Sequence, residues 1–529
     1  MGVMVLETRK AALPIGTVGS ADDYPDDYPG GARTGLFVAA IALGVALRLI
    51  AALWGDIGSG HDGEIRLYYA VQWAQRPHWQ GLSGVWPPLH WYVLGALLRV
   101  WNEPIILAKA IGFACGIGTV WAMRPAVRHV FGDTAAVVTA LLLAIFWTHI
   151  WLTSSYWVEP PYLLLVVLAL HYSTGQLGRK SMGRAVLSGL FLAVAIMLRH
   201  EGMIVLGLFL GWYALNARSP RLILAFAALP LLASAWHFVE PWLSGHSYFD
   251  YAGQVGAMKA GENAAQGVGL KDALKQWVLI PAVAPSLLVV LPGLYGLWRW
   301  RRLIRRDLFA WLLIGHVAFY LTLTLHSGWR PQLRYIMLYL INLLPYAALA
   351  WVELTRQRRL ARYGRPAILA GLVALTMLMQ ASGWWVGRNG RQAWGWLPLE
   401  VVTPPQHALD RWMATRALRG QTWMRVESIT TATLSDAWDV SHSYLIDGIA
   451  PGVVETHEIY VPEHPEVLAG RLPPVAYAAD VVLIDGQAAY YRPVLRSLMS
   501  RGPVRVVALQ QHVTVLLVSP AARRHIGSA

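Results

Sequence analysis

The amino-acid sequence predicts a polytopic α-helical membrane protein with about 11 transmembrane helices, a long first outer loop and a C-terminal soluble α/β domain. Three observations support this fold class. Hydrophobic residues fill 56% of the 529 positions and charged residues only 14%, for a mean hydropathy of +0.42. Apolar runs long enough for a helix to cross hydrocarbon recur as far as residue 386. Beyond that point, short β-branched runs alternate with turn residues.

The chain begins with a polar segment, residues 1–33, which we interpret as a tail on the cytoplasmic side. It lacks the uninterrupted apolar core and the following cleavage site of a secretion signal. The first apolar run is therefore expected to direct the chain to the membrane.

Residues 34–386 are predicted to form one transmembrane domain. Its spans are expected near 35–54, 105–123, 134–152, 160–172, 185–198, 201–216, 222–242, 277–298, 308–325, 334–352 and 366–386. A twelfth apolar run, PPLHWYVLGALLRVW at 87–101, is short for a crossing and begins with two prolines. Taken alone, it fits either a span or a partly embedded segment.

The distribution of Lys and Arg favours placing this twelfth run in a loop, 55–104. Seventeen Lys and Arg then fall within 48 residues on one side, in short loops at 124–133, 173–184, 217–221, 299–306 and 353–365. The two long loops on the other side, 55–104 and 243–276, hold only six in 84 residues. Because cytoplasmic loops carry the excess of Lys and Arg, the short loops are predicted to be cytoplasmic and the long ones extracytoplasmic.

This topology also accounts for the net charge of +14, so the basic composition does not indicate a nucleic-acid partner. The single cysteine, Cys115, excludes an intrachain disulfide and a cysteine-based metal site. No resident cofactor is predicted, although the sequence leaves a divalent cation open.

Residues 387–529 are predicted to form a small soluble α/β domain on the outer side. A helix-like stretch, PPQHALDRWMATRAL, precedes the β-branched runs ADVVLIDG, PVRVVAL and HVTVLLV, which turn residues separate. This part of the sequence contains no phosphate-binding glycine loop.

Ionisable side chains gather at the outer ends of the predicted spans, where each needs a partner, water or an edge position. They are His61, Asp62 and Glu64 after the first span, Lys109 opening the second, Glu159 after the third, Arg199 and Glu201 between the fifth and sixth, and Arg330 and Arg334 between the ninth and tenth. Cations can hold a phosphate, while a carboxylate accepts a proton. Transfer of a sugar from a lipid phosphate to a hydroxyl needs these two parts.

Simpler interpretations of these residues stay open. A carboxylate just past a span, such as Asp62, is commonly a solvated helix end. Glu159 precedes two prolines and would favourably begin a helix, with its charge near the positive end of the dipole. Arg199 and Glu201 would neutralise each other at a helix break, and His61 beside two carboxylates does not define a metal site.

The acidic motif HDGE, followed by Tyr68-Tyr69 and by WPPLHWYVLGALLRVW, resembles the GT-C superfamily of membrane glycosyltransferases. The likeness is to the protein O-mannosyltransferase and aminoarabinose-transferase branch, and it covers residues 35–350. It implies a polyprenyl-phosphate sugar donor. It also implies a long first outer loop, which the charge distribution predicts independently.

The resemblance assigns the family's catalytic acidic residue to Asp62 and its second acidic position to Glu159. The Pro-Pro-Leu of the family falls on 87–89. The family often has Asp and Glu adjacent, whereas Gly63 separates Asp62 from Glu64 here.

The resemblance also places the basic residues. The family's basic residue at the start of the second span falls on Lys109, which offers a point charge where the two-pronged arginine is usual. The late Arg-Tyr before a proline-containing span falls on Arg334 and Tyr335, with Pro345 beyond, and implies a contact with the donor phosphate.

The resulting hypothesis is an inverting glycosyltransferase that moves a sugar from a polyprenyl-phosphate donor to a hydroxyl of a protein, lipid or glycan acceptor, with Asp62 as the base. The predicted catalytic residues are Asp62, Glu64 and Glu159, and the predicted donor-phosphate or substrate contacts are Lys109, Arg199, Glu201, Arg330, Arg334, Tyr335, Tyr68 and His61.

The main alternative is a transporter or flippase of a lipid-linked or anionic substrate, because charges near broken helices also mark transport pathways. The sequence shows no pair of related halves, and its charges gather at one face, which disfavours this alternative. A membrane-anchored binding scaffold is a third class, for which eleven spans exceed what anchoring requires.

Overall fold

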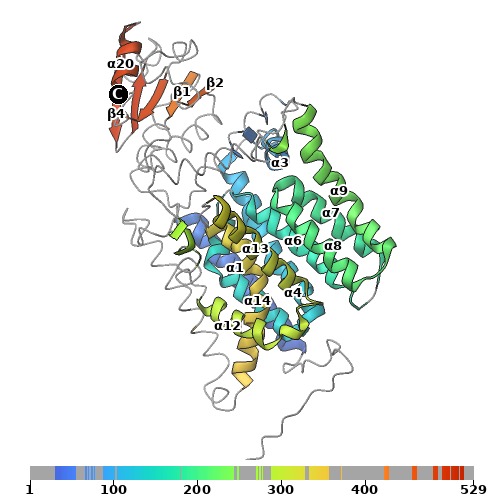
Figure 1. The fold of residues 1–529 in the computed structure, drawn as a ribbon. Coiled ribbons are helices and arrows are strands. Elements are labelled where there is room, and N and C mark those ends of the chain that lie inside the picture. Colours follow the sequence, from blue (N-terminus) through green and yellow to red (C-terminus); the bar gives the residue numbers. More distant parts are fainter. Residues whose placement is uncertain are drawn as a thin grey trace, which may run out of the picture.

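The structure is a computed structural model of the chain, in which a bundle of helices precedes a five-stranded sheet (Figure 1). It describes residues 30–54, 66–67, 69–70, 73–74, 77, 87–101, 104–155, 157–178, 180–243, 247–249, 270–271, 273–275, 277, 287–327, 333–356, 371, 374, 422–427, 455–460, 481–485, 491–500, 502–510 and 513–517. Outside the described residues lie most of the N-terminal tail, most of the first outer loop and most of the eleventh predicted span.

The described helices follow the predicted apolar runs along the chain. They are α1 (Gly30–Trp54), α3 (Leu89–Leu98), α4 (Pro104–Ile145), α5 (Trp147–Thr153), α6 (Glu159–Thr174), α7 (Met182–Leu198), α8 (Glu201–Asn216), α9 (Pro220–Leu243), α12 (Leu287–Arg299), α13 (Leu308–Ser327) and α14 (Leu333–Arg356), with a short 3₁₀ turn, η2 (Arg301–Leu303), before α13.

Five of the described helices are long and apolar enough to cross a membrane. These spans are Arg33–Ala52, Ile106–Ile145, Pro220–Leu243, Leu308–His326 and Met337–Leu354. They make the chain an integral membrane protein. Helices α7 and α8 are apolar but shorter, at 17 and 16 residues, so the total of eleven crossings stays a prediction.

Helix α4 differs from the sequence prediction, which had a loop at 124–133 between two spans. The chain is helical through most of that segment and breaks at Gly132, where φ is 80° and ψ is 169°. Only glycine adopts such a backbone without strain. Arg124 then donates to both Asp133 oxygens at 3.1 Å. Residues nine apart lie on opposite faces of a straight helix, so this ion pair requires the kink.

A second break, at Phe146, interrupts the span predicted at 134–152. Phe146 is extended, so α4 ends and α5 begins after it. The fully buried Arg48 of α1 spans this break: it donates to the carbonyls of Gly44 and Ala144 at 3.0 and 3.1 Å and to Oγ1 of Thr153 at 2.9 Å. Its Nη2 also lies 2.5 Å from Nδ1 of His149. A helix end in an apolar interior needs donors for its carbonyls, and Arg48 supplies one to Ala144.

One end of the bundle carries a cluster of charged residues: Glu159, Arg199 and Glu201. Helices α6 and α8 begin at this end, and α7 ends there. At or just beyond the other ends of these helices lie Lys180, Arg184 and Arg218. There Asn216 and Trp212 of α8 donate to the carbonyls of Arg305 and Arg306, at 3.2 and 2.8 Å.

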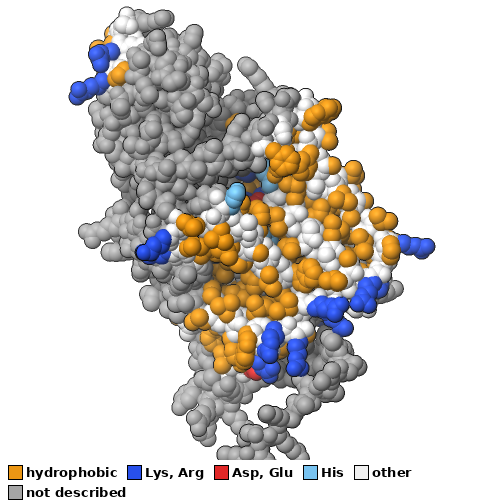
Figure 2. Space-filling view, in the orientation of Figure 1, with side chains coloured by type: hydrophobic (Ala, Val, Ile, Leu, Met, Phe, Trp, Pro, Cys, Tyr) orange, Lys and Arg blue, Asp and Glu red, His pale blue; other side chains and the backbone are white. Residues whose placement is uncertain are grey.

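Figure 2 shows Lys and Arg gathered along one edge of an apolar surface. The predicted separation of the two groups of charges is therefore present along α6, α7 and α8. Which end faces the cytoplasm stays a prediction.

The C-terminal strands form one mixed sheet of order β2-β1-β3-β5-β4. Its members are β1 (Thr422–Glu427), β2 (Glu455–Tyr460), β3 (Val481–Asp485), β4 (Arg505–Gln510) and β5 (Val513–Leu517), with α20 (Tyr491–Met499) between β3 and β4. β2, β1 and β3 are parallel, and β5 is antiparallel to β3 and β4. The three β-branched runs that the sequence analysis predicts, ADVVLIDG, PVRVVAL and HVTVLLV, thus form β3, β4 and β5. The predicted helix PPQHALDRWMATRAL lies outside the described residues, and a separate soluble domain stays a prediction.

Helices α7 and α9 approach closely at Gly189. A Cβ added there would lie 2.2 Å from the carbonyl oxygen of Phe226, whereas a Cβ at Gly207 would meet nothing within 4 Å. We expect Gly189→Ala to destabilise the protein by about 1–3 kcal/mol through overpacking, and Gly207→Ala to be neutral or stabilising because alanine favours helix. Thermal unfolding of the two purified variants in the same detergent tests this, and equal melting temperatures would contradict it.

Candidate active site

Glu159 begins α6 as a completely buried carboxylate. Two prolines follow it in the first turn, where a missing backbone N–H costs nothing. Its Oε1 accepts a hydrogen bond from Nη1 of Arg199. Its Oε2 has no hydrogen-bond partner among the described residues. Glu159 therefore lies in the first turn of α6, where its charge stabilises the helix N-terminus, as the simpler interpretation of the sequence predicts. It also belongs to an ion-pair network.

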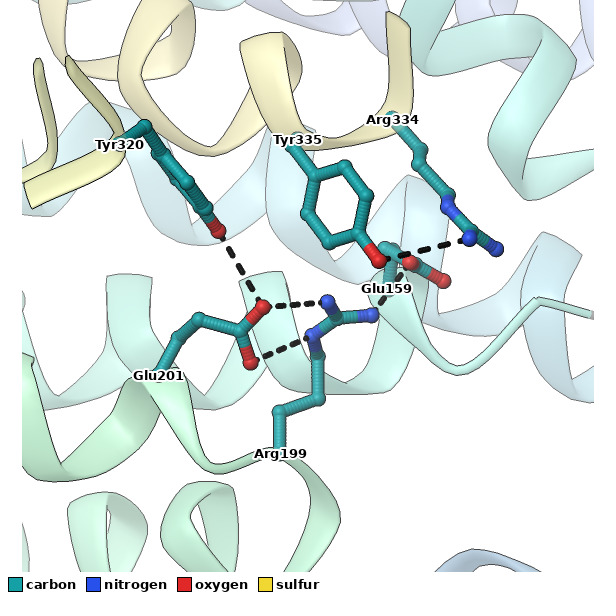
Figure 3. Close-up of polar contacts among 6 residues, drawn as sticks. All are labelled: Glu159, Arg199, Glu201, Tyr320, Arg334 and Tyr335. Carbon is teal, nitrogen blue, oxygen red and sulfur yellow. Dashed lines mark hydrogen bonds and ion pairs between the residues drawn. The ribbon is translucent and has the colours of Figure 1, made fainter. Parts of the chain in front are cut away.

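Arg199 lies in the break between α7 and α8, and Glu201 is the first residue of α8 (Figure 3). Arg199 is extended, with φ −149° and ψ 138°, so its side chain leaves the direction that α7 would impose. Its Nε donates to Oε2 of Glu201 at 3.2 Å and its Nη2 to Oε1 at 2.6 Å, which is the two-pronged geometry of a strong pair. With Glu159 on Nη1, this guanidinium binds two carboxylates at once.

Tyr320 of α13 connects a further helix to the same network. Its hydroxyl donates to Oε1 of Glu201 at 3.2 Å, and its side chain is almost fully buried. Glu201 thereby joins α7, α8 and α13 through hydrogen bonds to a single carboxylate.

Arg334 and Tyr335 open α14 beside this network. The Cζ of Arg334 lies 4.6 Å from the ring centroid of Trp157 and 4.9 Å from that of Tyr335. The Cζ of Arg199 lies 5.3 Å from the Tyr335 ring. Both guanidinium groups therefore contact one tyrosine, at distances at which the ring face attracts a cation.

The charges of this cluster are buried and compensated. Glu159 is 0% exposed, and Arg199 and Arg334 are each 7% exposed. A charge removed from water must be paired and hydrogen-bonded, and Arg199 meets this condition with Glu159 and Glu201. Arg199 thus fixes the two carboxylates, which favours an orienting role over direct phosphate binding. Arg334 is held differently: its guanidinium lies against the rings of Trp157 and Tyr335, and its Nη2 donates to the Tyr335 hydroxyl at 3.4 Å.

The structure brings together five of the predicted residues: Glu159, Arg199, Glu201, Arg334 and Tyr335. Lys109 is half-buried near the start of α4 and has polar contacts of its own. The predicted residues His61, Asp62, Glu64, Tyr68 and Arg330 lie outside the described residues.

Sequence reasoning missed Tyr320 and Trp157. Tyr320 lies in the apolar run HVAFYLTLT, where nothing marks it. Trp157 is adjacent to the predicted motif in SSYWVEPP, and the pairing of its ring with a distant arginine is a property of the fold alone. Among the described residues, no group of His, Cys, Asp and Glu is arranged to hold a metal ion.

The fold has counterparts among solved structures, whereas no protein-family description and no curated protein sequence matches the chain. ArnT from Cupriavidus metallidurans bound to undecaprenyl phosphate is similar with a TM-score of 0.58 at 15% identity, over 93% of this chain and 99% of that one. The same enzyme in the apo state gives 0.58 at 14% identity, with equal coverage. An Archaeoglobus fulgidus oligosaccharyltransferase in complex with Zn and sulfate gives 0.49 at 15% identity, over 85% of this chain and 68% of that one.

At 14–15% identity, the two ArnT structures show a shared fold. The resemblance to GT-C proteins that the sequence indicates is confirmed at that level. The fold is similar to that of ArnT, both with undecaprenyl phosphate and in the apo state, over 99% of that chain.

The sharing of Arg199 by two carboxylates leads to a prediction about stability. Arg199→Gln leaves two carboxylates without their counter-charge, so we expect a loss of about 3–5 kcal/mol and a clear fall in the melting temperature in detergent. Adding Glu159→Gln should recover part of the loss. The exposed Arg221→Gln is the control and should change stability by less than ~0.5 kcal/mol. An Arg199→Gln protein that melts with the wild type would disprove the network's structural role.

Proposed function

We propose that the chain is a membrane glycosyltransferase that moves a sugar from a polyprenyl-phosphate donor to an acceptor hydroxyl on the extracytoplasmic face. The observation that carries this proposal is the buried cluster of carboxylates and guanidinium groups at one end of the bundle, opposite the arginine-rich segments. Its occurrence on the fold of ArnT, which was solved with undecaprenyl phosphate, supports a lipid-phosphate substrate.

The proposed reaction is a single in-line displacement. The acceptor oxygen attacks the anomeric carbon while the bond from that carbon to the phosphate oxygen breaks, so configuration inverts and polyprenyl phosphate leaves. Asp62 takes the acceptor proton, with Glu64 beside it. Arg334, together with Lys109 and Arg330, neutralises the negative charge that grows on the departing phosphate.

Glu159 and Glu201 have a different role in this proposal. Both are bound to Arg199, so neither is a strong base. They would shape the acceptor side of the site or orient its cations, although Glu159 itself is completely buried. Tyr335, which contacts both guanidinium groups, keeps the phosphate side and the acceptor side at a fixed separation. His61 and Tyr68 would contact the substrate from the first outer loop.

The proposed organisation of the chain follows the sequence predictions. Residues 1–33 form a cytoplasmic tail, 34–386 the catalytic membrane domain and 387–529 an extracytoplasmic domain. The partners are the lipid-linked donor, a protein, lipid or glycan acceptor, and membrane lipid.

Asp62→Asn tests the assignment of the base. We expect sugar transfer to fall by about 10²–10⁴-fold with an unchanged melting temperature, because the amide cannot accept the acceptor proton. The measurement is the appearance of radiolabelled sugar on acceptors, using the full chain in liposomes and a panel of undecaprenyl-phosphate sugars. Glu353→Gln, on a half-exposed carboxylate 3.6 Å from Arg299, is the matched control. Full activity in Asp62→Asn would refute the assignment, and label that crosses the membrane without becoming covalently bound would favour a transporter.

Cysteine labelling tests the orientation, because Cys115 is the single cysteine of the sequence. In a Cys115→Ala background, Ser247→Cys and Arg302→Cys introduce thiols at two exposed positions, in the predicted outer and cytoplasmic segments respectively. A membrane-impermeant maleimide should label intact cells at position 247 and label position 302 only after permeabilisation. The reverse pattern would invert the proposed topology.

A further inference from the structure

The ring face of Trp157 holds the guanidinium of Arg334. Trp157 is 2% exposed and lies two residues before Glu159, in the segment that leads into α6. The Cζ of Arg334 is 4.6 Å from its ring centroid. The indole Nε1 has no hydrogen-bond partner among the described residues, so hydrogen bonding does not explain why a tryptophan is buried here. The side chain packs in the apolar core, with its ring centroid 5.8 Å from that of Trp151, and it presents a π face to Arg334.

Trp157 closes a cycle of contacts around the site. Arg334 contacts Trp157 and Tyr335, Tyr335 also contacts Arg199, and Arg199 binds Glu159, which is two residues from Trp157 along the chain. The cycle connects the starts of α6 and α14 with the end of α7. A guanidinium within this cycle has fewer accessible rotamers than the long arginine side chain has elsewhere.

We propose that Trp157 is a positioning residue: it fixes the Arg334 guanidinium where the phosphate of the lipid-linked donor binds, and it does not itself touch the substrate. This inference rests on the proposed function. Without the ring, Arg334 keeps its charge but loses its fixed place, so phosphate binding weakens while contacts with the lipid chain are unaffected. The expected loss of phosphate affinity is roughly tenfold, as for a buried cation–π contact.

The test compares undecaprenyl phosphate with undecaprenol as probes, using the purified full-length chain. The quantity measured is the ratio of the two dissociation constants, which general damage to the fold does not change. Trp157→Leu should lower the preference for the phosphate roughly tenfold, and Trp157→Phe should retain it within about threefold. The control is Trp212→Leu, at a tryptophan that is 1% exposed and donates to the carbonyl of Arg306 at the other end of α8. It should leave the ratio unchanged.

A double-mutant cycle with Arg334→Ala identifies the route of the effect. If Trp157 acts through Arg334, Trp157→Leu should cost less than about twofold once Arg334 is alanine. An equal loss in both backgrounds would overturn the proposal, as would a Trp157→Leu protein with wild-type preference for the phosphate. A wild-type chain that does not prefer the phosphate would instead overturn the proposed function, so the two failures are distinguishable.

Fluorinated tryptophans at position 157, introduced by nonsense suppression, keep the shape of the side chain if Trp157→Leu does not fold. Each added fluorine withdraws electrons from the ring face, so the preference for undecaprenyl phosphate should fall stepwise from tryptophan to the trifluoro derivative. A preference that is independent of fluorination would overturn the role of the ring face.

Discussion

The binding of two carboxylates by one buried arginine is the constraint on which the described site depends. Two features of the helix ends let Arg199 reach both Glu159 and Glu201. α7 ends at residue 198, so that Arg199 itself is extended, and α6 begins with a first turn that two prolines fix. If either helix were one turn longer, a carboxylate would be buried without its cation, which is strongly unfavourable. The helix boundaries and the ion pairs therefore determine each other, and Tyr320 extends this mutual dependence to α13.

The site divides its cations by the way in which each is held. Arg199 is bound by two carboxylates, whereas Arg334 lies against the Trp157 and Tyr335 rings and donates to the Tyr335 hydroxyl. The two guanidinium groups are equally buried, and Tyr335 contacts both.

Much of this arrangement could be predicted from patterns that depend on neighbours in the chain. Apolar runs gave the helices, and the break at Arg199 and the pair with Glu201 lie within three residues. The partners that the sequence could not supply are distant along the chain: Trp157 for Arg334, and Tyr320 for Glu201. The predicted loop at 124–133 was too long: the chain is helical through most of it, and two helices meet at a kink at Gly132. Asp62 remains a prediction, since its segment lies outside the described residues.

The buried Arg48 has a consequence for how the chain is assembled. It lies in the first apolar helix, yet the Ala144 carbonyl and the Thr153 hydroxyl that it binds lie 96 and 105 residues further along. At roughly 5–20 residues per second, a ribosome needs on the order of 5–20 s to make that length. During this interval a charged side chain that costs about 2.5–3.5 kcal/mol in hydrocarbon has the Gly44 carbonyl of its own helix as an acceptor but lacks those two later partners. The first helix must therefore wait at the insertion machinery, or at the bilayer edge, until the fold's later segments arrive.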